Sequence, residues 1–172
     1  MRWKIVLAIA PCLAIASVDE EEDTAGFHTY VNQDYDFSID YPSNWEESER
    51  GLQEYEVVKF LSPDGTLGIV EIFIFSSEPS TNLYDLVDTA GGNTRIISTV
   101  NTTIGGIPAV EQVYYQYESG ITAKAKDALI LRDNHDFIQI RYQVEPEDFD
   151  ESATIFDQMV DSFKMGLGLQ NN

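Results

Sequence analysis

The segment at residues 69–75 constrains the fold more than any other part of the sequence. Six of its seven residues are apolar, and Glu71 is the only polar one. A strand that is apolar on both faces needs cover on both faces, because exposed apolar surface is unfavourable in water. The sequence therefore predicts a sheet with a layer on each side.

Short turns join this segment to its neighbours. Residues 62–65, Ser-Pro-Asp-Gly, separate β-rich runs at 55–61 and 67–75 and predict a hairpin. The same reasoning predicts further strands at residues 37–41, 95–104, 109–118, 121–132 and 137–144. Strands that follow one another through short turns form antiparallel pairs.

Two segments have the periodicity of amphipathic helices. Residues 80–90 carry Leu83, Leu86, Val87 and Ala90 with i, i+3, i+4, i+7 spacing. A second helix is predicted to begin at Pro146, to carry Lys164 near its C-terminal end and to stop at Gly166. Its apolar stripe consists of Phe149, Ala153, Phe156, Val160 and Phe163, widened by Ile155 and Met159. The predicted fold class is therefore α/β (α+β), an antiparallel sheet flanked by helices on both faces in an α/β/α sandwich.

The first 16 residues have the layout of a secretory signal peptide. Arg2 and Lys4 precede an apolar run at residues 5–16, which ends in the small-residue pattern Ala-Ile-Ala. The run is shorter than the ~20 residues that cross a bilayer. We expect cleavage near Ala16, no transmembrane helix in the mature chain, and a secreted, cell-surface or otherwise extracytoplasmic location. Acylation of Cys12 is the alternative, although Pro11 stands where a small residue is expected.

Charge patterning suggests the domain boundaries and excludes one class of partner. An acidic linker at residues 17–26 is expected to precede a single domain at 27–165, and a short tail at 166–172 to follow it. The chain has 30 Asp and Glu against 10 Lys and Arg, a formal charge of −20, which signal cleavage would take to −22. Such a chain is not expected to bind nucleic acid. Cation binding, a basic protein partner and a saline habitat all fit this charge equally well.

Four segments, taken in chain order, resemble the PsbP family. They are YDFSIDYPSNW at residues 35–45, FLSP at 60–63, TIGGIPA at 103–109 and FDQMVDSF at 156–163. The resemblance covers residues 27–165 and implies an antiparallel sheet flanked by helices, export, and a non-catalytic role as an extrinsic accessory subunit. The family is best known at the oxygen-evolving centre of photosystem II. The acidic domain and simple leader look nearer to the exported prokaryotic and archaeal relatives.

Candidate binding sites in the sequence are weak. Asp133, His135 and Asp136 cluster oxygen and nitrogen donors that suit a metal, but polar residues are equally typical of a hairpin turn. A second acidic cluster lies at residues 145–151, where the dipole of a helix N-terminus also explains it. These clusters motivate the alternative function, a calcium-binding or calcium-responsive extrinsic membrane-associated protein. Asn101 begins an N-glycosylation sequon.

The sequence nominates no catalytic residue and no cofactor. Beyond Cys12 it has no cysteine, and it contains neither a G-x-S-x-G elbow nor an H-E-x-x-H motif. A carboxylate-dependent hydrolase is the weakest alternative, and it would need two acids facing each other in a cleft. We therefore expect a non-enzymatic accessory or binding domain that recognises an unidentified protein partner or membrane complex.

Overall fold

The computed structural model describes residues 26–49, 54–63, 65, 67–76, 83, 93–118, 120–132 and 136–166. The elements, in chain order, are β1 (Phe27–Asn32), β2 (Phe37–Pro42), β3 (Glu46–Ser48), β4 (Glu56–Leu61), β5 (Ile69–Ser76), β6 (Thr94–Ile104), β7 (Ile107–Glu118), β8 (Ile121–Leu131), β9 (Asp136–Val144), α2 (Phe149–Ser162) and β10 (Lys164–Met165). The predicted signal peptide, Cys12, most of the acidic linker and the tail beyond Gly166 lie outside the described residues.

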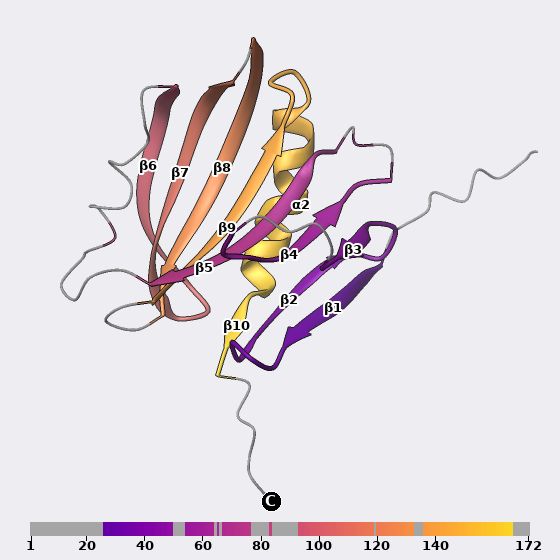
Figure 1. The fold of residues 1–172 in the computed structure, drawn as a ribbon, viewed down its shortest axis with the longest axis vertical. Helices are drawn as coiled ribbons and strands as arrows, with labels where there is room; N and C mark the ends of the chain where they lie inside the picture. The colour runs from indigo at the N-terminus through magenta and orange to yellow at the C-terminus, as the bar shows by residue number, and fades with distance from the viewer. Residues whose placement is uncertain are drawn as a thin grey trace, which may run out of the picture.

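The described strands form two antiparallel sheets (Figure 1). The large sheet has the order β3-β4-β5-β9-β8-β7-β6, and the small one has the order β1-β2-β10. The predicted antiparallel arrangement is confirmed, as are the predicted strands that correspond to β2 and to β4 through β9. The turn between β6 and β7 uses Gly105 and Gly106, whose φ angles of 57° and 82° suit a two-residue hairpin.

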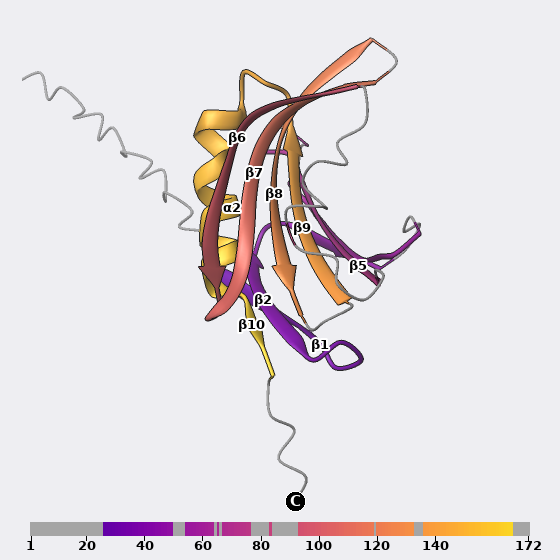
Figure 2. The same ribbon diagram turned by 90° about the vertical axis from the view of Figure 1, so that its left-hand side faces the viewer.

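Helix α2 lies against one face of the large sheet (Figure 2). Its predicted apolar stripe is buried, with Phe156, Val160 and Phe163 at 1%, 2% and 1% exposure. Phe156 stacks on Tyr142 of β9 with 5.6 Å between the ring centroids. Phe163 stacks on Phe37 of β2 at 5.7 Å, which joins the small sheet to the same core. Each such buried aromatic side chain contributes about 1.5–3 kcal/mol.

The ends of α2 differ from the prediction. Its N-cap residue is Asp148, and Pro146 lies before the helix in a turn closed by Asp148 N–H donating to the Glu145 carbonyl at 3.1 Å. Pro146 therefore takes the second position of a β-turn, where its fixed φ is favoured. Lys164 lies beyond the helix in β10, paired with Ser38 of β2. The strand hydrogen bonds to β2 replace the last helical turn that the sequence had suggested.

The opposite face of the large sheet, which carries Glu71, Asp127 and Arg141, is called here the α2-distal face. At one end of it Leu83 packs with Val110, Leu129 and Phe137 in a second apolar cluster. Leu83 is helical, and the rest of the predicted helix at 80–90 lies outside the described residues. The α+β class and the helix layer formed by α2 are confirmed. Of the second predicted helix layer, on the α2-distal face, the structure describes Leu83.

Strand β5 is covered on both faces along its middle. Val70 and Ile72 face α2 and are 0% exposed, while Phe73 on the other face is 8% exposed. Ile69, at the start of the strand, is 36% exposed. The predicted cover on both faces is therefore present along the middle of β5. It does not extend to Ile69, the first residue of the strand.

Candidate functional site

A row of polar side chains crosses the α2-distal face. Directly opposite partners on successive strands are Lys59, Glu71, Arg141, Asp127, Gln112 and Thr99, from β4, β5, β9, β8, β7 and β6. Residues directly opposite in an antiparallel pair share a face and interact. The first four alternate in charge sign, and Gln112 Nε2 donates to Thr99 Oγ1 at 3.2 Å. We call these six residues the polar row.

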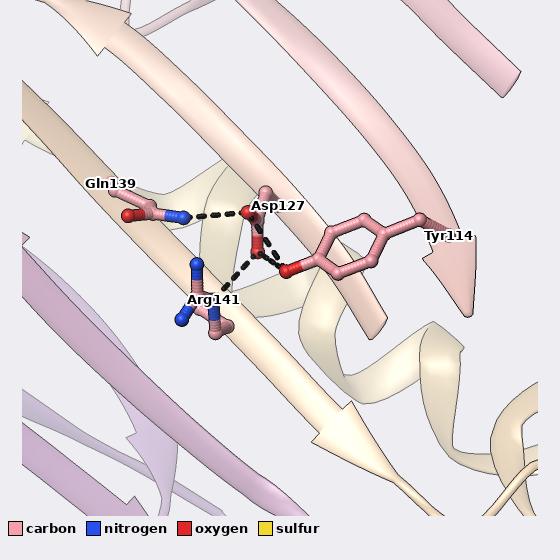
Figure 3. Close-up of polar contacts among 4 residues, drawn as sticks. All are labelled: Tyr114, Asp127, Gln139 and Arg141. Atoms are coloured by element: carbon pink, nitrogen blue, oxygen red, sulfur yellow. Dashed lines mark hydrogen bonds and ion pairs between the residues drawn. The ribbon is translucent and has the colours of Figure 1, made fainter. Parts of the chain in front are cut away.

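Asp127 is the centre of a buried network in this row (Figure 3). Arg141 Nε lies 3.2 Å from Asp127 Oδ1, and Gln139 Nε2 donates to Asp127 Oδ2 at 2.5 Å. The Tyr114 hydroxyl lies 3.2 and 3.1 Å from the two carboxylate oxygens. Asp127 itself is 5% exposed. The network thereby ties β7, β8 and β9 together through side chains in addition to their backbone ladder.

The electrostatics of the network favour a structural role for the carboxylate. Burial raises the pKa of Asp127, and the charge of Arg141 with the hydrogen bonds from Arg141, Gln139 and Tyr114 opposes that rise. Burial also raises the pKa of Tyr114 far above its usual value, so its hydroxyl stays protonated and can donate. A carboxylate already engaged by a cation and two other donors is poorly suited to act as a general base.

A hollow lies on the same face, nearer the tip of the β7–β8 hairpin. It has a volume of about 350 Å³ and is lined by Gln116, Glu118, Ile121, Ala123 and Gln143. These residues belong to β7, β8 and β9, the three strands that the Asp127 network joins. Ile121 is 70% exposed. The hollow is therefore an accessible surface lined by apolar side chains, two neutral amides and one carboxylate, on the three strands that the Asp127 network also joins.

The structure describes one of the three weak metal candidates. Asp136 lies at the start of β9 and accepts a hydrogen bond from Ser76 Oγ at 2.6 Å, while Asp133 and His135 lie outside the described residues. Among the residues described, no group of three or more His, Cys, Asp or Glu side chains could hold a metal ion. In the acidic cluster at 145–151, Asp150 pairs with Lys124 at 3.0 Å.

The other nominated residues lie apart from the hollow. Asn101 is exposed on β6, opposite Val110 of β7.

The acids of the α2-distal face influence one another. Burial raises the pKa of Glu71, and the nearby carboxylates of Glu56 and Asp127 raise it further. Glu71 nevertheless lies directly opposite both Lys59 and Arg141, and the hollow contains a single carboxylate, Glu118. No helix in the described ranges is long and apolar enough to span a membrane.

Sequence reasoning missed Asp127, Gln139, Arg141 and the hollow. One signal was available: Gln139, Arg141 and Gln143 occupy alternate positions of β9 among apolar residues, which indicates one polar face on an otherwise buried strand. The partner of that face in β8 could not be read locally, because strand register depends on the folded sheet.

Comparisons with known proteins identify the family. The family model described as PsbP-like protein matches residues 13–165. The solution structure of cyanobacterial PsbP, CyanoP, from Synechocystis sp. PCC 6803 superposes with a TM-score of 0.63 at 14% identity, covering 92% of this chain and 98% of that one. No curated protein matches the chain at a significant level.

Two further solved structures have the same fold. A variant of the protein Mog1 gives a TM-score of 0.55 at 11% identity, with 81% of this chain and 96% of that chain covered. LpqN of Mycobacterium tuberculosis, involved in cell envelope biogenesis, gives 0.51 at 10% identity, with 84% and 87% covered. At these identities the structural likeness carries the fold alone, while the family match spans most of the sequence. The chain belongs to the PsbP-like family.

Proposed function

We propose that this chain is an exported, non-enzymatic accessory domain that binds a protein partner or membrane complex outside the cytoplasm through the hollow on its α2-distal face. The observation that carries the proposal is the hollow itself, an accessible apolar and amide-lined surface on strands β7, β8 and β9. Family membership and the signal-like leader support an extracytoplasmic role.

The chemistry of the hollow favours a protein over a small charged ligand. Protein interfaces combine an apolar centre, depleted in charge, with neutral hydrogen-bonding groups at its rim. Ile121 supplies an apolar side chain that is 70% exposed, and Gln116 and Gln143 supply donors and acceptors. On a chain with a formal charge of −20, a surface with one carboxylate is a place where a partner meets little repulsion.

The Asp127 network suits this function because it makes the floor of the hollow rigid. A binding surface that is already ordered loses less conformational entropy when the partner arrives. Tyr114 precedes Gln116 by two positions on β7 and shares its face, and Arg141 stands in the same relation to Gln143 on β9. Fixing the network residues therefore fixes the strands that present the lining side chains.

Site-specific photo-crosslinking in native cells tests the proposal. A photoreactive residue replaces Ile121, and a matched control carries it at Val31, which is 50% exposed on β1 of the small sheet. We expect a discrete protein adduct from position 121, none of the same mass from position 31, and its loss when Ala123→Arg fills the hollow. An equal yield at both positions, no adduct from position 121, or an adduct that survives A123R would refute the proposal.

A further inference from the structure

The two edges of the large sheet differ sharply. One edge is β3, which has three residues, two of them Glu46 and Glu47. The other is β6, which has 11 residues and is hydrogen-bonded to β7 on one side, with no second partner strand among the described residues. Short, charged edge strands resist pairing with other chains, whereas long uncharged ones promote it. Edge β3 is thus protected, whereas β6 has no such protection among the residues that the structure describes.

The composition of β6 is unusual for this chain. The strand reads TRIISTVNTTI, with Arg95 as its single charged residue and no acid, proline or glycine, in a chain that has 30 acids. Its side chains are mostly exposed, including Ile96, Ile97 and Val100 at 43%, 49% and 56%. A bulge lies between Ile96 and Ser98, so the regular part of the edge runs over residues 98–104, which are uncharged.

We propose that β6 pairs antiparallel with β6 of a second copy of this chain, which joins two large sheets into one continuous sheet across a twofold axis. With the axis at Asn101, Thr99 lies opposite Thr103 of the second copy and Val100 lies opposite Thr102 of the second copy. Residues 99, 101 and 103 share one face of β6, so every pair in this register is matched in face. Thr–Thr and β-branched pairs are favourable across strands.

The absence of acids from this edge argues for a second copy as the occupant. An edge that captured a basic segment would be expected to present carboxylates to it. Two copies that each carry −20 repel each other, and salt screens that repulsion beyond roughly 8 Å at physiological ionic strength. The acid-free strand β6 is therefore a surface where two copies can approach within hydrogen-bonding distance with few like charges in contact. Pairing also shelters apolar groups of Val100, which lies within the paired segment and is 56% exposed in the single chain.

Self-pairing goes beyond the proposed function and uses a different surface from the hollow. It also bears on the sequon at Asn101, since a glycan there would stand on the twofold axis. Glycosylation of Asn101 and pairing of β6 therefore exclude each other.

Analytical ultracentrifugation of the purified, unglycosylated mature chain tests the proposal. We expect the average mass to rise from one chain to two across micromolar to millimolar concentrations, more readily in high salt. Asn101→Asp sets two carboxylates opposite each other at the axis and should weaken association at least about tenfold. The control Gln158→Glu makes the same isosteric change on an exposed position of α2 and should associate like wild type.

A charge-swap mixture tests the register directly. N101D and N101K should each associate weakly, whereas an equimolar mixture of the two should recover association because opposite charges then meet at the axis. A wild-type chain that stays monomeric throughout, an N101D chain that associates like wild type, or a mixture no stronger than its components would overturn the proposal. Since only this chain is present, the outcome is independent of any partner for the hollow.

Discussion

Replacing Arg141 with methionine should expose the cost of the buried carboxylate at the centre of the polar row. Removing one member of a buried ion pair costs about 3–5 kcal/mol, because the other charge is left without its counterion. The Arg141 side chain is 29% accessible, so water partly solvates the pair and we expect about 2–3 kcal/mol at pH 7. Loss of the contact with Phe73, whose ring centroid lies 5.4 Å from the guanidinium, adds about 0.5–1 kcal/mol.

The pH dependence of this loss distinguishes the ion pair from simple packing. Burial raises the pKa of Asp127, and without Arg141 the opposing charge is gone. An acid whose pKa is higher in the folded state than in the unfolded state favours folding while it is protonated. This contribution to stability is fully present below the unfolded-state pKa and is lost as the pH rises through the folded-state pKa. The R141M penalty should therefore be largest at neutral pH and should shrink as the pH falls and Asp127 takes up a proton.

A double-mutant cycle with Asp127→Leu completes the test. Replacing both members by apolar residues leaves no unpaired buried charge and is often close to neutral. The D127L/R141M double variant should be less destabilised than the sum of the two single variants by at least about 1 kcal/mol. Urea denaturation followed by fluorescence of Trp45, which is 5% exposed, measures all four proteins. Additive single effects, or an R141M penalty unchanged between pH 7 and pH 5, would refute the reasoning.

Three further predictions concern the sheet and its core. A Cβ at Gly68 would lie 2.5 Å from the Gln143 carbonyl oxygen, whereas one at Gly106 meets nothing within 4 Å. Gly68→Ala should therefore destabilise the fold by at least about 1–2 kcal/mol more than Gly106→Ala. The difference between their urea midpoints measures this. Burial and neighbouring carboxylates raise the pKa of Glu71, so Glu71→Gln should raise the urea midpoint at pH 7 and leave it unchanged below about pH 4; a lower midpoint at pH 7 would contradict this. Phe156→Ala should cost about 3–5 kcal/mol, and a loss below about 1 kcal/mol in calorimetry would mean that α2 does not hold the core as described.

Much of the fold could be predicted because its signals are local. Apolar periodicity located the stripe of α2, and the turn at residues 62–65 located the β4–β5 hairpin, since each depends on residues near in sequence. Strands β3 and β10 were missed because they have three and two residues, too few for any periodicity. The start of α2 was misplaced because proline suits both a first helical position and a β-turn.

The candidate site depended on information that no local pattern carries. Asp127 and Arg141 are 14 residues apart, and Lys59 enters the same row only through the pairing of four strands. A polar residue inside a buried strand shows that a partner is needed. Which residue supplies the partner is decided by sheet register, and the hollow beside it exists because three strands are held in that register.

The most direct measurement of the central claim is hydrogen–deuterium exchange of the chain with and without the partner captured at position 121. Exchange should slow on complex formation at residues 114–125 and 141–144, which carry or adjoin the lining of the hollow, and should be unchanged along α2. Protection confined to α2 or to the small sheet, with exchange at the hollow unaltered, would contradict the claim that the α2-distal face is the binding surface.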